Sequence, residues 1–208
     1  RYHGWTYGLD GTLLRAPEMQ GVERFVPEEL RLVPVQVAEW GPLVFVNLDG
    51  KAPPLLEVLE DIPARVAPFG CERMRWVMRK SWDLACNWKV YVDNYLDGGY
   101  HVNTVHPGLA GVLDYANYTT TVHRWTSLQR SPLKPAGGSE GTTRTGTDAA
   151  YWWAYPNAMV NLYAGVMDTN VVQPMGVDRC RVAFDFYFAA GTDPAFVRES
   201  VAVADRIQ

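Results

Sequence analysis

Two of the chain's four histidines, His101 and His106, lie five positions apart in the segment NYLDGGYHVNTVH (94–106). Neutral imidazoles bind iron, zinc, copper and nickel, and two histidines with one carboxylate form the open site of non-haem Fe(II) oxygenases. Side chains at i and i+5 of a regular helix diverge, so the spacing alone is equally typical of two polar loop residues. The two histidines are therefore a candidate metal site that needs support from their surroundings.

Polar neighbours favour the metal site. They stand close to the histidines on a helix that is otherwise apolar: Asp93, Asn94, Asp97 and Tyr100. Such groups are costly to bury unless they serve one another or a metal. Gly98 and Gly99 should end this helix, and a bend there can turn both imidazoles toward one ion. Without a metal, Asp93 would lie on an exposed helix face and Asp97 would simply end the helix.

The elements around this segment are predicted from the spacing of apolar residues. A helix is expected at 87–97, where Trp88, Tyr91, Val92 and Tyr95 recur with helical period, and a strand is expected before it at 72–86. Further strands are predicted at 119–128, 150–156, 158–164, 168–174 and 179–189, with a polar, glycine-rich loop at 134–148. A last helix begins near Pro194, with Asp193 as its N-cap. This part has an α+β pattern, an antiparallel sheet with helices against it.

The first fifty residues have a different pattern. A hairpin is predicted at 4–14 around an Asp-Gly turn. Residues 31–48 alternate through valines, turn at 39–42 and return as a buried strand. We therefore expect a β module at 1–50, then a linker, and then one short amphipathic helix at 55–66.

Composition limits the classes of function. The chain has 208 residues, 48% of them hydrophobic, and a net charge of −4, without a run of Lys or Arg. This argues against nucleic acid or an anionic membrane as a partner, and no apolar stretch reaches the roughly 18 residues that span a bilayer. Three scattered cysteines argue for a reducing compartment, so we expect a cytoplasmic location. The chain lacks an initiator Met and its last helical pattern has no end signal, which predicts a fragment of a longer protein.

Two motifs resemble one known family. Residues 87–106, NWKVYVDNYLDGGYHVNTVH, resemble the iron-site segment of Rieske-type non-haem iron oxygenases, and residues 1–14, RYHGWTYGLDGTLL, resemble the second ligand motif of their Rieske domain. The resemblance extends over essentially the whole chain. Within the family, CNWKVYVDNYLDGGYHV and YPNAMVNLY are more similar to the choline monooxygenase-like, quaternary-ammonium branch than to the aromatic-ring dioxygenases. It implies the C-terminal part of a Rieske β domain at 1–50 and a helix-grip catalytic domain at 51–208, an antiparallel sheet with a long C-terminal helix.

The resemblance also implies metal ligands. His101 and His106 match the two histidine ligands of the mononuclear Fe(II), and His3 matches one histidine ligand of the Rieske [2Fe–2S] cluster. In such a cluster two histidines replace two cysteines on one iron. The third ligand of the mononuclear iron, an aspartate, is expected just past Gln208, and Asp205 lies more than a turn too early to replace it. We therefore expect the chain as given to lack a complete cluster and to be inactive.

Other roles are implied for nearby residues. Asp97 is the candidate electron-transfer bridge between a cluster and the iron of the next subunit, although family members place this acid where Gly98 stands here. Asn94 matches an asparagine beside the iron ligands. In YWWAYPNAMVNLY (151–163), three rings are expected to cage a trimethylammonium group by cation–π attraction: Trp153, Tyr155 and Tyr163. The alternative for these rings is the core face of the sheet.

The implied function is the alpha subunit of an oxygenase system. It would use O2 to hydroxylate, demethylate or cleave a small organic substrate, with a quaternary ammonium compound as the leading choice. NAD(P)H would supply electrons through a separate reductase or ferredoxin, and the oligomer would be a head-to-tail homotrimer. The alternatives are an aromatic-ring hydroxylating dioxygenase, a non-enzymatic helix-grip ligand-binding protein, and a structural zinc site that adds Cys86 to the two histidines.

Overall fold

The computed structural model describes residues 3–135 and 143–207, which form two compact units. The first unit contains the chain up to Ala38 together with Val44–Ala52, and the second contains Glu39–Leu43 and the chain from Pro53 onward. The loop predicted at 134–148 lies partly outside the described residues.

The first unit begins with a small hairpin. Strand β1 (Thr6–Tyr7) pairs antiparallel with β2 (Leu13–Arg15), as predicted for this segment. The Asp10 carboxylate accepts hydrogen bonds from the Thr12 amide at 3.1 Å and the Thr12 hydroxyl at 2.7 Å. Gly11 follows with φ +82°, a left-handed conformation that glycine adopts without strain. The Asp-Gly pair therefore forms the turn for the reason its sequence indicates.

A second strand pair follows and begins later than predicted. Strand β3 (Gln36–Trp40) pairs with β4 (Leu43–Asn47), and a short 3₁₀ turn (Pro27–Glu29) precedes them. The strand expected from residue 31 starts only at Gln36. Pro34 has no N–H to donate to a ladder, so the alternating valines before Gln36 do not join the strand.

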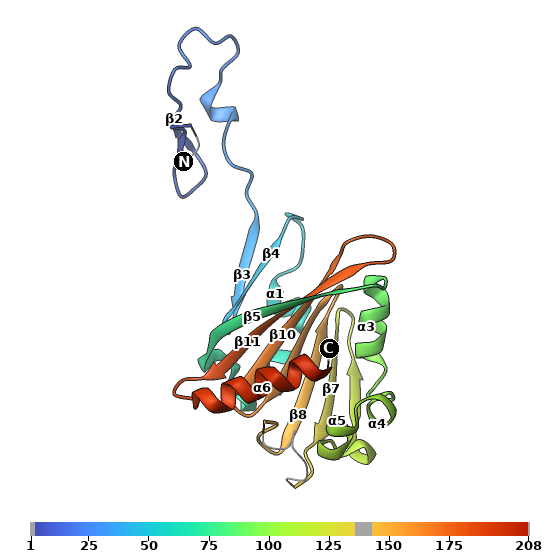
Figure 1. The fold of residues 1–208 in the computed structure, drawn as a ribbon. Coiled ribbons are helices and arrows are strands. Elements are labelled where there is room, and N and C mark those ends of the chain that lie inside the picture. Colours follow the sequence, from blue (N-terminus) through green and yellow to red (C-terminus); the bar gives the residue numbers. More distant parts are fainter. Residues whose placement is uncertain (1–2, 136–142, 208) are drawn as a thin grey trace. The chain divides into compact units, whose positions relative to one another are not determined.

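The second unit is built on a seven-stranded antiparallel sheet (Figure 1). Its strand order is β5-β11-β10-β9-β8-β7-β6. The strands are β5 (Met74–Leu84), β6 (Thr119–Val122), β7 (Thr126–Pro132), β8 (Asp148–Ala154), β9 (Ala158–Tyr163), β10 (Val166–Pro174) and β11 (Cys180–Ala189). The single strand predicted at 119–128 is wrong, because the chain reverses there and the His123 amide donates to the Thr126 carbonyl at 2.9 Å. The other predicted strands of this sheet are confirmed to within a few residues.

Helices cover one face of this sheet. The last helix, α6 (Pro194–Ile207), crosses the face in Figure 1, and its Val201 and Ala204 are buried in the core with Phe184 and Phe186. Its start is as predicted, since the Ala195 amide donates to Asp193 Oδ1 at 2.8 Å. Helix α3 (Trp88–Leu96), also predicted, packs Val92 into the same core. Shorter helices follow it: α4 (Val102–Val105), α5 (Pro107–Val112) and a 3₁₀ turn (Tyr115–Asn117).

The helix predicted at 55–66 is wrong as a single element. The structure has two short helices, α1 (Leu55–Leu59) and α2 (Ile62–Val66), with Glu60 between them at φ +53°. Pro63 lies in the first turn of α2, where its missing N–H does no harm, but in the middle of a longer helix it would break the ladder. Two 3₁₀ turns follow, Ala67–Phe69 and Cys71–Arg73. No helix in residues 3–135 and 143–207 is long and apolar enough to cross a membrane.

An ion pair between β5 and β11 gives a test of the sheet. Asp185 Oδ2 accepts from Arg79 Nη2 at 2.6 Å, and Asp185 Oδ1 accepts from Arg79 Nε at 3.0 Å and Trp76 Nε1 at 2.8 Å. Burial raises the pKa of Asp185, but these donors more than offset it and leave the pKa below the ordinary 3.8. We expect Asp185→Asn to lower the free energy of unfolding by about 1 kcal/mol at pH 7, a figure reduced for the exposure of Arg79.

The sign of the pH dependence follows from the lowered pKa. The carboxylate stabilises the fold fully above the unfolded value of 3.8, and this contribution is lost as the pH falls through the lower folded value. Urea unfolding at a series of pH values should show the difference between Asp185→Asn and the original chain shrinking below 3.8. Asp83→Asn is the control, because its partner Arg181 and Asp83 itself are both well exposed and little change is expected. Equal effects of the two substitutions would contradict the prediction.

Candidate metal and substrate site

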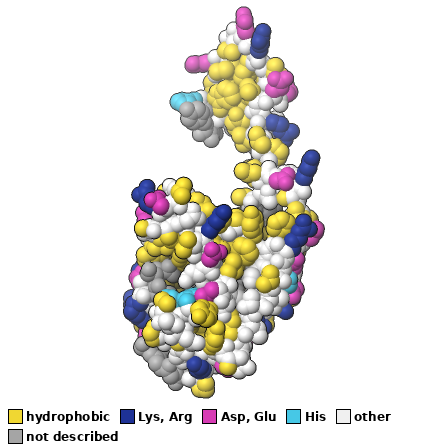
Figure 2. Space-filling view, turned by 90° about the vertical axis from the view of Figure 1, so that its right-hand side faces the viewer, with side chains coloured by type: hydrophobic (Ala, Val, Ile, Leu, Met, Phe, Trp, Pro, Cys, Tyr) yellow, Lys and Arg dark blue, Asp and Glu magenta, His cyan; other side chains and the backbone are white. Residues whose placement is uncertain are grey.

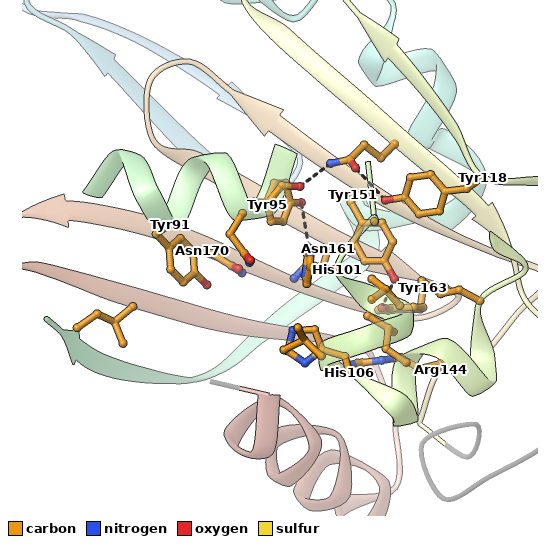
Figure 3. Close-up of a pocket in the computed structure, with 18 residues that line it drawn as sticks. Tyr91, Tyr95, His101, His106, Tyr118, Arg144, Tyr151, Asn161, Tyr163 and Asn170 are labelled. Carbon is orange, nitrogen blue, oxygen red and sulfur yellow. Dashed lines mark hydrogen bonds between the residues drawn. The ribbon is translucent and has the colours of Figure 1, made fainter. Parts of the chain in front are cut away.

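The helix-covered face of the second unit holds a cavity of about 350 Å³. Its wall comes from α3, from the segment that carries α4 and α5, and from strands β5 and β7–β10. Figure 3 shows the side chains that line it, and Figure 2 shows histidine and acidic side chains beside a hollow on this unit. The wall contains residues that lie far apart in the sequence, so the cavity depends on the folded sheet that brings them together.

The two histidines of the opening motif meet in this cavity. His101 precedes α4 and His106 follows it, and their ring centroids lie 5.2 Å apart with the ring planes at 78°. Both side chains line the cavity. The backbone reaches this arrangement by leaving α3 through Gly98 and Gly99, at φ +74° and +76°. Two consecutive residues with positive φ cost the least conformational free energy when both are glycine. The glycine pair therefore explains why the helix ends here, as predicted.

Asp97 fixes the orientation of His101. Its Oδ2 lies 2.5 Å from His101 Nδ1 and accepts from the His101 amide at 3.1 Å, while its Oδ1 accepts from the Gly99 amide at 2.9 Å. A proton held on Nδ1 by the carboxylate leaves Nε2 as the nitrogen that can bind a metal. The same carboxylate therefore stabilises the glycine turn and fixes the orientation of the His101 ring.

The histidine pair fits a mononuclear iron in its donor chemistry. Two imidazoles open onto one cavity, and a carboxylate orients one of them, as metal-binding histidines require. Within the part of the chain that the structure describes, no group of three His, Cys, Asp or Glu side chains could hold a metal. Asp205 forms an ion pair with Lys80 instead. The third ligand expected past Gln208 stays a prediction.

The zinc alternative gains no support. Cys86 Sγ lies 3.9 Å from Cys180 Sγ, and Cys86 does not line the cavity that holds the histidines. All three cysteines of the chain are free.

The other predicted site residues fall into two groups. Asn94 and Tyr163 line the cavity, but Trp153 and Tyr155 do not. Trp153 packs against the sheet core, and Tyr155 is 62% exposed, with its ring 6.1 Å from that of Trp153. His3, in the first unit, is exposed at φ +46°. The roles of these residues in substrate or cluster binding stay predictions.

The sequence reasoning missed most of the cavity wall. The missed aromatic and polar residues are Tyr91, Tyr95, Tyr118, Gln129, Arg144, Tyr151, Asn161 and Asn170. The hydroxyls of Tyr151 and Tyr163 are hydrogen-bonded to each other at 2.8 Å. The Tyr95 hydroxyl donates to Asn161 Oδ1 at 3.0 Å. Burial raises the pKa of Tyr95 and of Tyr151 well above the ordinary 10, so both phenols are neutral. A usable signal was present: Asn161 stands alone among apolar residues on β9, and Asp168 and Asn170 share one face of β10.

The glycine turn gives a second test. A Cβ added at Gly99 would lie 3.1 Å from the Tyr118 ring, whereas one added at Gly98 would meet only Thr120 Oγ1 at 3.8 Å. Both substitutions by alanine impose left-handed strain of about 1 kcal/mol, and crowding adds about another 1 kcal/mol at Gly99 alone. Urea unfolding should therefore rank Gly99→Ala below Gly98→Ala in stability, and equal values would show that Tyr118 moves aside without penalty.

Comparison with known proteins identifies the family. Residues 71–208 match the family model described as the ring hydroxylating alpha subunit, catalytic domain. The chain belongs to this family. It is 38% identical over 220 residues to the choline monooxygenase, chloroplastic, of Arabidopsis thaliana, covering 100% of this chain and 52% of that protein. It is 32% identical over 193 residues to the carnitine monooxygenase oxygenase subunit of Escherichia coli (strain K12), covering 90% and 51%. The chain thus spans about half the length of these relatives.

Solved structures agree with this assignment. The quaternary ammonium Rieske monooxygenase CntA, in complex with an inhibitor, has a TM-score of 0.84 and 26% identity and covers 98% of this chain and 56% of that chain. Naphthalene 1,2-dioxygenase from Rhodococcus has a TM-score of 0.74 over 99% of this chain and 57% of that chain, at 19% identity, which shows the fold alone. The predicted α+β fold, an antiparallel sheet with a long C-terminal helix, and the predicted Rieske oxygenase alpha subunit of the quaternary-ammonium branch are confirmed.

Proposed function

We propose that the full-length protein is the oxygenase component of a Rieske non-haem iron monooxygenase that oxidises a quaternary ammonium compound. The observation that carries this proposal is the His101–His106 pair opening onto a tyrosine-lined cavity, with Asp97 on His101 Nδ1. The names of the relatives, choline and carnitine monooxygenases, support the choice of substrate class.

Each part of the cavity has a proposed task. His101 and His106 hold the mononuclear Fe(II), which when bound supplies the activation of O2 and the oxidation itself. Asp97 holds the His101 ring in its metal-binding orientation, and Asn94 forms part of the cavity wall. The tyrosine faces attract a trimethylammonium group by cation–π interaction, and Tyr163, whose ring lies against Arg144, belongs to the same substrate-binding wall.

The remaining cofactors and partners belong to the whole protein. We assign it a Rieske [2Fe–2S] cluster with His3 as one ligand, and electrons from NAD(P)H through a separate reductase or ferredoxin. A head-to-tail homotrimer would place a cluster near the iron of the next subunit, with Asp97 as the bridge. A related CntA structure is described in terms of inter-subunit electron transfer, which supports this arrangement. Three free cysteines support the cytoplasm as its location.

The test is substrate turnover by full-length protein supplied with a reductase, NAD(P)H and O2. We expect O2 consumption coupled to product with choline, L-carnitine or γ-butyrobetaine, and none with naphthalene. Turnover of aromatic compounds alone would favour the ring-hydroxylating dioxygenase instead. Binding of a ligand by iron-free protein, unchanged by His101→Ala, would favour the non-enzymatic binding protein.

A further inference from the structure

The cavity wall contains one positively charged side chain. Arg144 is the only Lys or Arg among the described residues that line it, and its Cζ lies 4.6 Å from the centre of the Tyr163 ring. A guanidinium repels a quaternary ammonium group and binds a carboxylate through paired N–H donors. Its place on the wall therefore indicates an anionic group at one end of the substrate.

A buried carboxyl group lies on the same sheet face. Asp168 on β10 is 5% exposed, and its Oδ1 accepts hydrogen bonds from Asn161 Nδ2 at 2.8 Å and Asn170 Nδ2 at 2.7 Å. Both asparagines line the cavity. Burial raises the pKa of Asp168, and the charge of Arg144 together with the two amide donors opposes that rise. The amide groups are thus fixed with their N–H donors toward the acid, as a carboxylate acceptor requires.

The strand register places Asp168 and Asn170 at increasing distances from Tyr163. Asp168 pairs with Asn161, which precedes Tyr163 on β9 by two residues. Asn170 pairs with Met159, which precedes Tyr163 by four. Those steps correspond to about 7 and 13 Å along the strand. In the view of Figure 3, Arg144 and Tyr163 are drawn toward one end of the row of side chains, and Tyr91 and Asn170 toward the other. The guanidinium therefore lies at the Tyr163 end of this face, and Asn170 lies further along the strands.

We propose that Arg144 binds a carboxylate of the substrate, so that the protein acts on a zwitterionic quaternary ammonium carboxylate rather than on an amino alcohol such as choline. The cationic end then lies toward Tyr91 and Tyr95, away from Arg144, with the Asp168 carboxyl group behind the asparagines. This inference rests on the proposed function, because it uses the same cavity, and it separates the two chemistries of the curated relatives, choline and carnitine.

The experiment compares dissociation constants of γ-butyrobetaine and choline for iron-loaded, full-length protein, measured by titration calorimetry without O2. We expect the original protein to bind γ-butyrobetaine at least tenfold more tightly than choline. Arg144→Gln should weaken γ-butyrobetaine binding about ten- to a hundredfold, the usual range for losing a charge-assisted contact, and should leave choline binding unchanged or tighter. Arg144→Lys should lie between, since it keeps the charge and loses the paired donors.

Lys134→Gln is the matched control. Its ammonium donates to the Ala110 carbonyl at 2.9 Å and does not line the cavity, so both dissociation constants should stay unchanged. Retained choline binding shows that Arg144→Gln is folded. Equal weakening of both ligands would assign Arg144 a structural role and overturn the inference, as would choline binding as tight as γ-butyrobetaine in the original protein; the proposed function survives both results. If neither compound binds the original protein, the proposed function fails and the inference fails with it.

Discussion

Replacing His101 or His106 with alanine in the full-length protein is expected to reduce its mononuclear iron to background and its substrate oxidation by more than about a hundredfold. The described part of the cavity supplies only two imidazoles for the metal, so each replacement leaves a single one. Loss of a group that merely orients a ligand already costs about 10- to 100-fold in metal affinity or activity, and loss of the ligand itself costs more. The measurement is metal content per chain, with cluster iron counted separately from its visible absorption.

His123 is the matched control for this experiment. Its Nδ1 lies 3.1 Å from Glu60 Oε2 and its Nε2 lies 3.0 Å from Asp61 Oδ1, and it is not among the residues that line the cavity. His123→Ala should therefore keep both iron and activity. Full mononuclear iron in both cavity variants would show that the histidine pair is not the metal site.

The sheet was predictable because its strands carry their own signals. The apolar residues of β9, β10 and β11 alternate or form short runs bounded by turns, and this local pattern does not depend on the rest of the fold. The strand at 119–128 was not divided correctly, since residues 123–125 contain none of the Gly, Pro, Asn or Asp residues that usually mark a turn. Only the antiparallel pairing of β6 with β7 shows where the chain turns.

The cavity wall was not predictable to the same extent. The histidines carry a recognisable motif, but Tyr151, Asn161 and Gln129 come together only through the register of three strands. Arg144 belongs to a glycine-rich segment whose sequence gives no direction for a side chain. Trp153 lies on the same face of β8 as Tyr151, as alternation predicts, but two residues further along the strand, where it does not line the cavity, and Tyr155 lies past the end of β8.

Asp97 shows where sequence reasoning stopped short. The acid stands one position earlier than the bridging acid that the family resemblance implies. The sequence therefore left open whether its carboxylate could contact His101. In the structure the Gly98–Gly99 turn reverses the chain, and the Asp97 carboxylate lies 2.5 Å from His101 Nδ1. This contact is one half of the bridge. Contact with a cluster ligand of a neighbouring subunit, the second half of a bridge, stays a prediction.

Asp97→Asn separates these two roles. The amide oxygen can still accept from the Gly99 N–H, so the turn should survive, but the anion beside His101 Nδ1 is lost. We expect iron affinity or activity to fall about 10- to 100-fold. If Asp97 is also the bridge, oxidation of the reduced cluster in a single turnover, followed by stopped-flow absorption with iron-saturated protein, should slow as well, while reduction of the cluster by the reductase stays unchanged.

Asp93→Asn is the control for charge, because Asp93 lies one turn earlier on the exposed side of α3 and does not line the cavity. It should leave iron affinity and both electron-transfer rates unchanged. Weakened iron binding in Asp97→Asn with an unchanged rate of cluster oxidation would limit Asp97 to orienting His101. A slowed rate at full iron occupancy is expected only if the carboxylate connects the two metal centres, because an acid that merely positions a ligand acts through the amount of iron held.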